Sequence, residues 1–257
     1  MGYSQPDFRI REGWVYFEKL NLMNVKKIGI IGGLGPEATI QYYQIFVKRY
    51  KEILKTDHFP EIVINSVDMK RMVDLVASKD FEGLIDFLSA EIALFERCGI
   101  TTAAISSNTP HMVFDQLQER TSVKLISIVA SACVAIKDSN VKRVGLLGTK
   151  LTMSGGFYQK ESQKYGIEIF TPTEEDQVFI HDIYLKELVN NIIKPETKAR
   201  LIEIVVSLQK EFQLEGVILG GTELPLIIDQ ADFEDVKIFN TTKIHIDAIL
   251  KCAYLAA

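Results

Sequence analysis

Residues 25–32 read VKKIGIIG and residues 141–148 read VKRVGLLG, so the chain contains nearly the same stretch twice. A tyrosine also follows each first valine by seventeen residues, at Tyr42 and Tyr158. Self-similarity at a fixed distance indicates a duplicated structural unit. Continuous apolar runs ending in a glycine turn are typical of strands buried on both faces of a parallel sheet. The repeat predicts two related halves, each opening with a buried strand, a turn and a helix.

Both halves continue in the same order. The sequence predicts a second strand at 61–68 in the first half and at 167–172 in the second. Apolar residues three and four apart then predict long helices at 81–98 and at 183–212, the latter with a break near Pro195.

The third strand of each half runs into a polar turn, AISSNTPH at 104–111 and VILGGTELP at 217–225. Ser107 and Gly221 are 114 residues apart, close to the 116 between the first strands, so the two turns are equivalent. In open α/β sheets, ligands bind beyond the carboxyl ends of the strands. Two facing halves would bring both turns to one cleft. Such a cleft suits racemisation or epimerisation, in which a proton leaves one face of a molecule and arrives at the other.

The predicted fold class is therefore α/β, with two pseudo-symmetric doubly wound domains, parallel sheets flanked by helices, and a site in the cleft between them. The predicted divisions are an N-terminal extension at 1–23, a first domain at 24–124 plus 234–257, and a second domain at 125–233. The extension lacks the continuous apolar core of a signal peptide.

Composition narrows the functional classes. The 257 residues are 47% hydrophobic and 25% charged, as in ordinary globular proteins. A net charge of −5 without a basic run argues against nucleic acid or an anionic membrane as partner. Three widely spaced cysteines predict a reducing, cytoplasmic compartment without disulfides or zinc-type pairing: Cys98, Cys133 and Cys252.

The glycine turn GGLGPEA at 32–38 contains G-x-G-x-x-A, which is part of a dinucleotide-binding fingerprint. That fingerprint needs an acidic residue at the end of the second strand, where this chain has Asn65 and Ser66, with Asp68 only in the loop beyond. Pro36 suits a first helical turn. We therefore expect no nucleotide cofactor, and a tight turn around Gly33 whose amides hold a ligand carboxylate.

Four motifs in order resemble the aspartate/glutamate racemase family, in particular its subgroup for acidic amino acids. They are GIIGGLGPEAT, SNTPH, LLGTKLTM followed by FY, and GGTELPL, and the resemblance extends from Met23 to the C-terminus. It implies an isomerase that needs no pyridoxal phosphate or other cofactor, two pseudo-symmetric domains and a homodimer. It also implies a pair of cysteines, one of which removes the α-proton of an aspartate- or glutamate-like substrate while the other donates on the opposite face.

The two family cysteine positions are Ser107 and Gly221 here, so a two-thiol mechanism cannot operate with this pair. The three actual cysteines are expected to be small buried hydrophobes. The resemblance leaves Glu223, beside the second position, as a further candidate acid or base.

The turns supply further candidates for substrate binding. Arg71 stands at the spacing where related racemases hold the substrate side-chain carboxylate, a task for its bidentate fork; an exposed loop arginine is the alternative. Asn108 and Thr109 either bind the ligand, cap the helix near Pro110, or do both. The other candidates follow the two later strands: Thr149, Thr152 and Thr222.

The histidines predict no metal site. His111 lies in a first helical turn, where capping or packing is expected. The other three show no ligand spacing: His58, His181 and His245.

Three functional hypotheses follow from these residues. The first is proton transfer at the α-carbon of a small acidic amino acid, as in a racemase. The second is a ligand-binding or regulatory protein that keeps the cleft without the chemistry. The third is a lyase or decarboxylase, which needs proton transfer on one face only.

Overall fold

A computed structural model of the chain describes residues 26–255, so the predicted N-terminal extension at 1–23 lies outside the described residues. The first half contains, in chain order, β1 (Ile28–Gly32), α2 (Pro36–Leu54), β2 (Ile62–Ser66), α3 (Met69–Ala77), α4 (Phe81–Arg97), β3 (Thr102–Ile105), η1 (Thr109–Val113), α5 (Phe114–Glu119) and β4 (Lys124–Ile126). The second half contains α6 (Ile128–Asp138), β5 (Arg143–Gly148), α7 (Lys150–Ser154), α8 (Phe157–Gln163), β6 (Glu168–Phe170), α9 (Glu174–Lys186), η2 (Leu188–Asn190), α10 (Pro195–Phe212), β7 (Gly216–Gly220), η3 (Leu224–Leu226), η4 (Gln230–Asp232) and β8 (Lys237–Asn240). The last elements are α11 (Thr241–Leu250) and η5 (Lys251–Leu255).

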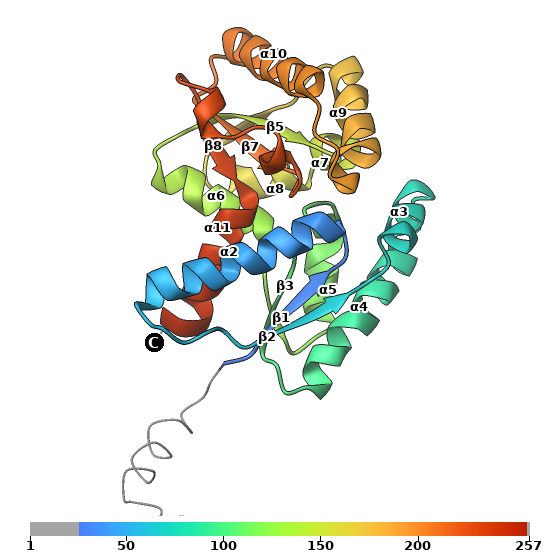
Figure 1. The fold of residues 1–257 in the computed structure, drawn as a ribbon. Helices are drawn as coiled ribbons and strands as arrows, with labels where there is room; N and C mark the ends of the chain where they lie inside the picture. The colour runs from blue at the N-terminus through green and yellow to red at the C-terminus, as the bar shows by residue number, and fades with distance from the viewer. Residues whose placement is uncertain (1–25, 256–257) are drawn as a thin grey trace, which may run out of the picture.

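The two halves have the same sheet topology. Each contains a four-stranded parallel sheet, in the order β2-β1-β3-β4 and β6-β5-β7-β8. The repeated stretches form the central strands β1 and β5, and helices flank both sheets (Figure 1). The predicted α/β fold with two parallel sheets is confirmed.

Strand β1 shows why its own sequence, IGIIG, carries no polar side chain. Ile28 and Ile30 are buried in a core shared with α2 and α11, whereas Ile31 is buried in a second core formed with α3, α4 and α5. Gly29 faces the ring of Phe95, and a Cβ there would lie 2.8 Å from that ring. A strand covered by helices on both faces has no solvent-facing position, so its sequence shows no polar alternation.

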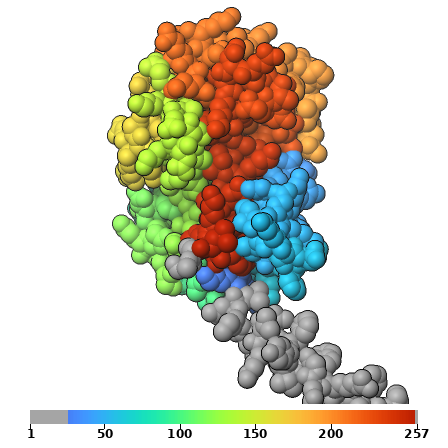
Figure 2. Space-filling model, turned by 90° about the vertical axis from the view of Figure 1, so that its left-hand side faces the viewer, coloured from blue at the N-terminus to red at the C-terminus, as the bar shows by residue number. Residues whose placement is uncertain are grey.

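The chain passes between the halves twice. After β4, helix α6 packs into the core of the second half; after β8, helix α11 returns to the core that contains α2. The predicted division placed 234–257 in the first domain. Residues 237–240 lie in the second half instead, because the backbone of β8 pairs with β7 and completes the second sheet. Figure 2 shows this C-terminal segment, in red, running from one half to the other.

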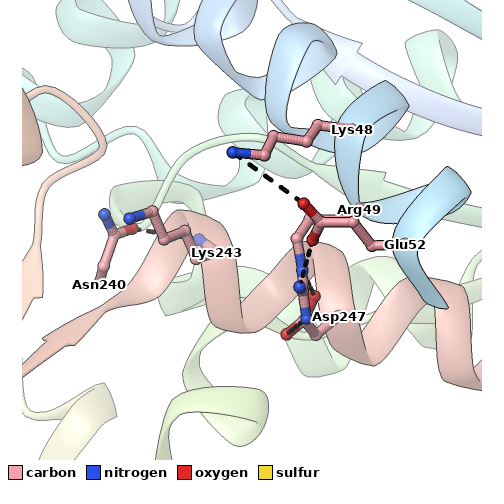
Figure 3. A network of polar contacts seen from close by, with 6 residues as sticks. All are labelled: Lys48, Arg49, Glu52, Asn240, Lys243 and Asp247. Atoms are coloured by element: carbon pink, nitrogen blue, oxygen red, sulfur yellow. Dashed lines mark hydrogen bonds and ion pairs between the residues drawn. The ribbon is translucent and has the colours of Figure 1, made fainter.

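An ion pair fixes α11 on the first half. Arg49 of α2 donates from Nε and Nη2 to the two carboxylate oxygens of Asp247, at 2.7 and 2.8 Å (Figure 3). Glu52 and Lys48 extend the network along α2. A bidentate guanidinium–carboxylate pair holds both planes in one orientation, so it fixes the rotation of α11 relative to α2.

The break predicted near Pro195 is confirmed, because α9 ends at Lys186 and α10 begins at Pro195, whose ring suits a first helical turn. Two local predictions need correction. The helix before this break begins at Glu174 and not at residue 183. The cysteines are not uniformly buried. Cys133 lies in the core of the second half, where burial raises its pKa to about 12. Cys252 is half-buried, but Cys98 is exposed because it caps the end of α4.

No helix within residues 26–255 combines the length and apolar character needed to cross a membrane.

Candidate functional site

A cavity of about 480 Å³ lies between the two halves, lined by residues of both. Hydroxyls beyond the strand ends contribute to its lining: Ser107 and Thr109 after β3 of the first half and Thr149 after β5 of the second. Helix α3 of the first half and helix α9 of the second also border it, and they lie on the same side of the molecule in Figure 1. This is the place at which open α/β sheets bind their ligands.

Two hydrogen bonds from Ser106 to strand β1 hold the turn after β3. The Ser106 hydroxyl and backbone N–H both donate to the carbonyl of Ile31, at 2.9 Å each. Ser107 follows, and its side chain borders the cavity although only 5% of the residue is exposed. The turn therefore presents one hydroxyl to the cavity.

Asn108 connects the two halves instead of capping a helix. It stands at the N-cap position of η1, but its side chain makes no capping hydrogen bond. Its carbonyl oxygen accepts from the Tyr158 hydroxyl at 2.6 Å, and its amide donates to Thr241 Oγ1 at 3.3 Å. The residue is 2% exposed and does not line the cavity, so its side chain belongs to the protein interior.

Three threonine hydroxyls form a closed triangle at the cavity. Thr109 Oγ1 lies 3.1 Å from Thr149 Oγ1 and 3.2 Å from Thr152 Oγ1, and the last two are 3.0 Å apart. Thr149 also caps α7, because its hydroxyl accepts from the backbone N–H of Thr152. Thr109 and Thr149 line the cavity, whereas Thr152 is fully buried. The triangle gives the site hydroxyl donors that a ligand carboxylate can accept from.

The turn after β7 is closed by an aromatic ring. A Cβ at Gly221 would overlap the ring of Tyr184, whose Cζ would lie only 3.1 Å away. Tyr184 belongs to α9, lines the cavity, and donates its hydroxyl to Glu223 Oε2. The space for a side chain at Gly221 is therefore filled by the phenol of another residue.

Glu223 is a buried carboxyl group with one free oxygen. Its Oε2 accepts from the hydroxyls of Tyr184 and Thr222, the latter at 2.9 Å, while Oε1 has no hydrogen-bond partner among residues 26–255. Oε1 lies against Gly35, where a Cβ would overlap it. Burial raises the pKa of Glu223, and the two hydroxyl donors offset part of that rise. The pKa of Tyr184 is also raised, first by burial and then by the charge of Glu223.

The glycine turn is shaped by its own chain. Gly33 has a φ of 78° and Gly35 a φ of 135°, both in the range that favours glycine. The Thr39 hydroxyl accepts from the backbone N–H of Gly33 at 2.9 Å and donates to the carbonyl of Gly35 at 3.0 Å. Gly33 is not among the cavity-lining residues, and the carboxyl group beside this turn is that of Glu223.

Arg71 lies on the outer side of α3. Its guanidinium stacks 4.3 Å above the ring of Phe87, and the residue is exposed and absent from the cavity lining. The structure thus brings Ser107, Thr109 and Thr149 together at the cavity and places Arg71 away from them.

His111 packs and caps, as expected from the sequence. Its Nε2 accepts from the backbone N–H of Ile128 at the start of α6, at 3.1 Å, and its ring stacks on Phe114. Burial, followed by the neighbouring His245, lowers the pKa of His111 to about 3. Within residues 26–255, no cluster of three or more His, Cys, Asp or Glu side chains could hold a metal ion.

Sequence reasoning missed the residues that α3 and α9 bring to the site. The apolar spacing of Met69, Met72, Val73 and Val76 marks one face of a helix, a signal that could have been found. Tyr184 gave no such signal, because only the packing of α9 against the turn after β7 brings it to Gly221.

The fold and the paired turns define a class of two-half α/β proteins with a shared site. The family model for Asp/Glu/hydantoin racemases matches residues 31–249, so the chain belongs to that family. The solved structure of an aspartate racemase homologue from Pyrococcus horikoshii OT3 is 34% identical, covers 89% of this chain and 99% of its own, and has a TM-score of 0.77.

Two further relatives define the range of the likeness. The broad specificity amino-acid racemase RacX of Bacillus subtilis strain 168 is 25% identical over 216 residues, which span 80% of this chain and 89% of RacX. The glutamate racemase of Francisella tularensis, solved with D-glutamate, shares the fold at 16% identity, with a TM-score of 0.64 over 90% of this chain and 82% of its own.

Proposed function

We propose that the protein binds a free α-amino acid in the cavity between its halves and catalyses cofactor-independent proton transfer at the α-carbon, as a racemase-like isomerase. The observation that carries this proposal is the Tyr184–Glu223 pair. Its phenol fills the space that a side chain at Gly221 would need, and its hydroxyl is hydrogen-bonded to a buried carboxyl group. A proton-accepting pair thus stands beside the position of the missing second thiol.

The proposed step is a proton relay through Tyr184 to Glu223. The α-carbon–hydrogen bond breaks, the proton passes to the phenol oxygen of Tyr184, and the phenol proton passes to Glu223. The reverse transfer restores the same enantiomer, whereas delivery of a proton from solvent water to the opposite face, on the side of Ser107, gives the other; the hydroxide so formed is neutralised by the proton that Glu223 releases. A raised carboxyl pKa moves Glu223 toward the working pH, which improves it as a base.

The electron pair left on the α-carbon needs stabilisation. The hydroxyls of Thr109 and Thr149 line the cavity, and either one can turn its proton from the triangle to the ligand carboxylate. Hydrogen bonds that are aligned in advance with developing negative charge are the strongest contribution of this kind.

A second candidate function, ligand binding without chemistry, is favoured by one observation. Burial raises the pKa of Tyr184 well above its ordinary range, so its phenol stays protonated at neutral pH, and Ser107 offers only a neutral hydroxyl. In this second function the cavity would serve as a sensor or carrier site for the amino acid.

One experiment separates the two. The protein is incubated in D2O with the L and D forms of several amino acids, apolar and acidic, and the α-proton is followed by NMR while chiral chromatography measures inversion. Loss of the α-proton signal supports proton transfer, and its appearance in both enantiomers supports a racemase. Thermal stabilisation by an amino acid without any exchange would establish binding alone and overturn the isomerase.

A further inference from the structure

One wall of the cavity is a single apolar helix face. Met69, Met72, Val73 and Val76 are spaced i, i+3, i+4 and i+7 along α3, and all four line the cavity. Asp68 caps the helix by accepting from the backbone N–H of Lys70 at 2.8 Å, which fixes where the helix begins and hence which face turns inward.

The opposite wall also carries apolar side chains, beside Lys150, Ser154 and His181. Leu151 of α7 and Leu185 of α9 line the cavity from the second half, beside the ring of Tyr184. Leu34 of the glycine turn completes this surface. The hydroxyls of Ser107, Thr109 and Thr149 are thus confined to the part of the cavity at the strand ends.

Within residues 26–255, none of the basic side chains near the cavity lies on the methionine and valine face of α3. Arg71 is on the outer side of α3, two residues from Met69, and stacks on Phe87. Lys150 pairs with Glu174 at 3.2 Å, and burial lowers the pKa of His181, which keeps that imidazole neutral at neutral pH. Lys79 is exposed at the edge of the cavity.

We propose that the cavity selects amino acids with a flexible apolar side chain, such as methionine or leucine, over aspartate and glutamate. This inference rests on the proposed function, because it takes the polar end of the ligand to be held by the hydroxyls at the strand ends. An apolar side chain gains by leaving water for the methionine and valine face of α3. A carboxylate side chain against that face of α3 loses its hydration among methionine and valine side chains.

Calorimetric titration of the full chain with L- and D-methionine, leucine, aspartate and glutamate tests the inference. We expect the apolar amino acids to bind at least tenfold more tightly than the acidic ones. The matched control is Arg71→Gln on the outer side of the same helix, which should leave every affinity within about twofold of the wild type.

A second variant reverses the selectivity. Val73→Arg places a guanidinium on the cavity face of α3 and should weaken methionine binding at least tenfold while strengthening aspartate binding. If this variant does not fold, Val73→Thr keeps the side-chain shape, adds a hydroxyl and should weaken methionine binding severalfold.

Two results would overturn the inference, and they are distinguishable. Tighter binding of aspartate or glutamate that is lost in Arg71→Gln would overturn the apolar selectivity and leave the proposed function standing. Absence of binding by every amino acid, apolar or acidic, would overturn the proposed function itself and the inference with it.

Discussion

The turn after β3 and the turn after β7 are equivalent in the duplicated fold, but they present different groups to the cavity between them. The first turn presents Ser107 directly. The second offers only Gly221, and Tyr184 from a distant helix covers that position and binds Glu223. Duplication has therefore kept the backbone while the chemistry of the two turns diverged. The first turn presents its own side chain to the cavity, whereas the place of a side chain at the second turn is filled by Tyr184 of α9.

The sharpest way to break this comparison is to place a cysteine at each turn. Ser107→Cys changes little in volume and should cost less than about 1 kcal/mol of unfolding free energy. Gly221→Cys pushes against the Tyr184 ring and should cost about 1–3 kcal/mol. Tyr184→Ala should cost the most, about 3–5 kcal/mol, because it opens a cavity and removes one of the two hydroxyl donors to Glu223.

Urea denaturation of the single and double variants measures these effects. The combination of Gly221→Cys with Tyr184→Ala should cost less than its two components together, by roughly 0.5–3 kcal/mol, since the alanine makes room for the thiol. Strictly additive costs would show that Tyr184 does not occupy the space beside Gly221.

A second test compares the acid sensitivity of the two turns. His111 follows the first turn and lies 6.3 Å from His245 between ring centroids; burial lowers their pKa values to about 3 and about 4. Both bind protons more readily when unfolded, so their contribution to stability is complete above pH 6.5 and is lost as the pH falls. The free energy of unfolding should drop by roughly 2 kcal/mol per histidine between pH 7 and pH 5.

Urea midpoints across this pH range check the result. His245→Gln should flatten the pH dependence by about half, whereas His58→Gln, an exposed histidine, should leave it unchanged. An equally steep dependence in His245→Gln would place its origin in other groups.

The second turn should respond to pH with the opposite sign and a smaller amplitude. Burial raises the pKa of Glu223, so its contribution is present below the unfolded pKa and is lost as the pH rises through the folded value. Glu223→Gln should therefore cost little at pH 7 and gain stability relative to the wild type as the pH rises. Thermal melts between pH 5 and pH 9 would contradict this if the two proteins kept a constant difference.

Much of the fold could be predicted from the sequence, because it depends on local patterns. The repeated apolar strands at Ile28–Gly32 and Arg143–Gly148 and the matching polar turns place the cavity between the halves. Side chains that reach the cavity from helices could not be placed in the same way. The resemblance left Arg71 either at the ligand or exposed, and helical spacing relative to Met69 and Met72 turns it away from the cavity.

The closure of Gly221 by Tyr184 lay beyond sequence reasoning for a physical reason. It depends on how α9 packs against β5 and on the hydrogen bond from the Tyr184 phenol to Glu223, neither of which leaves a periodic or local signal. The crossing of α11 to the first half is a similar case, since its decisive contact joins Arg49 and Asp247, 198 residues apart.

The most direct test of the central claim is the rate of α-proton exchange in D2O for the wild type beside Tyr184→Phe. The phenylalanine keeps the ring over Gly221 and removes only the hydroxyl that connects the cavity to Glu223. If this pair transfers the proton, exchange in the wild type should fall at least tenfold in Tyr184→Phe while the affinity for the amino acid stays within about threefold. Equal exchange rates in the two proteins, or no exchange in the wild type, would contradict the account.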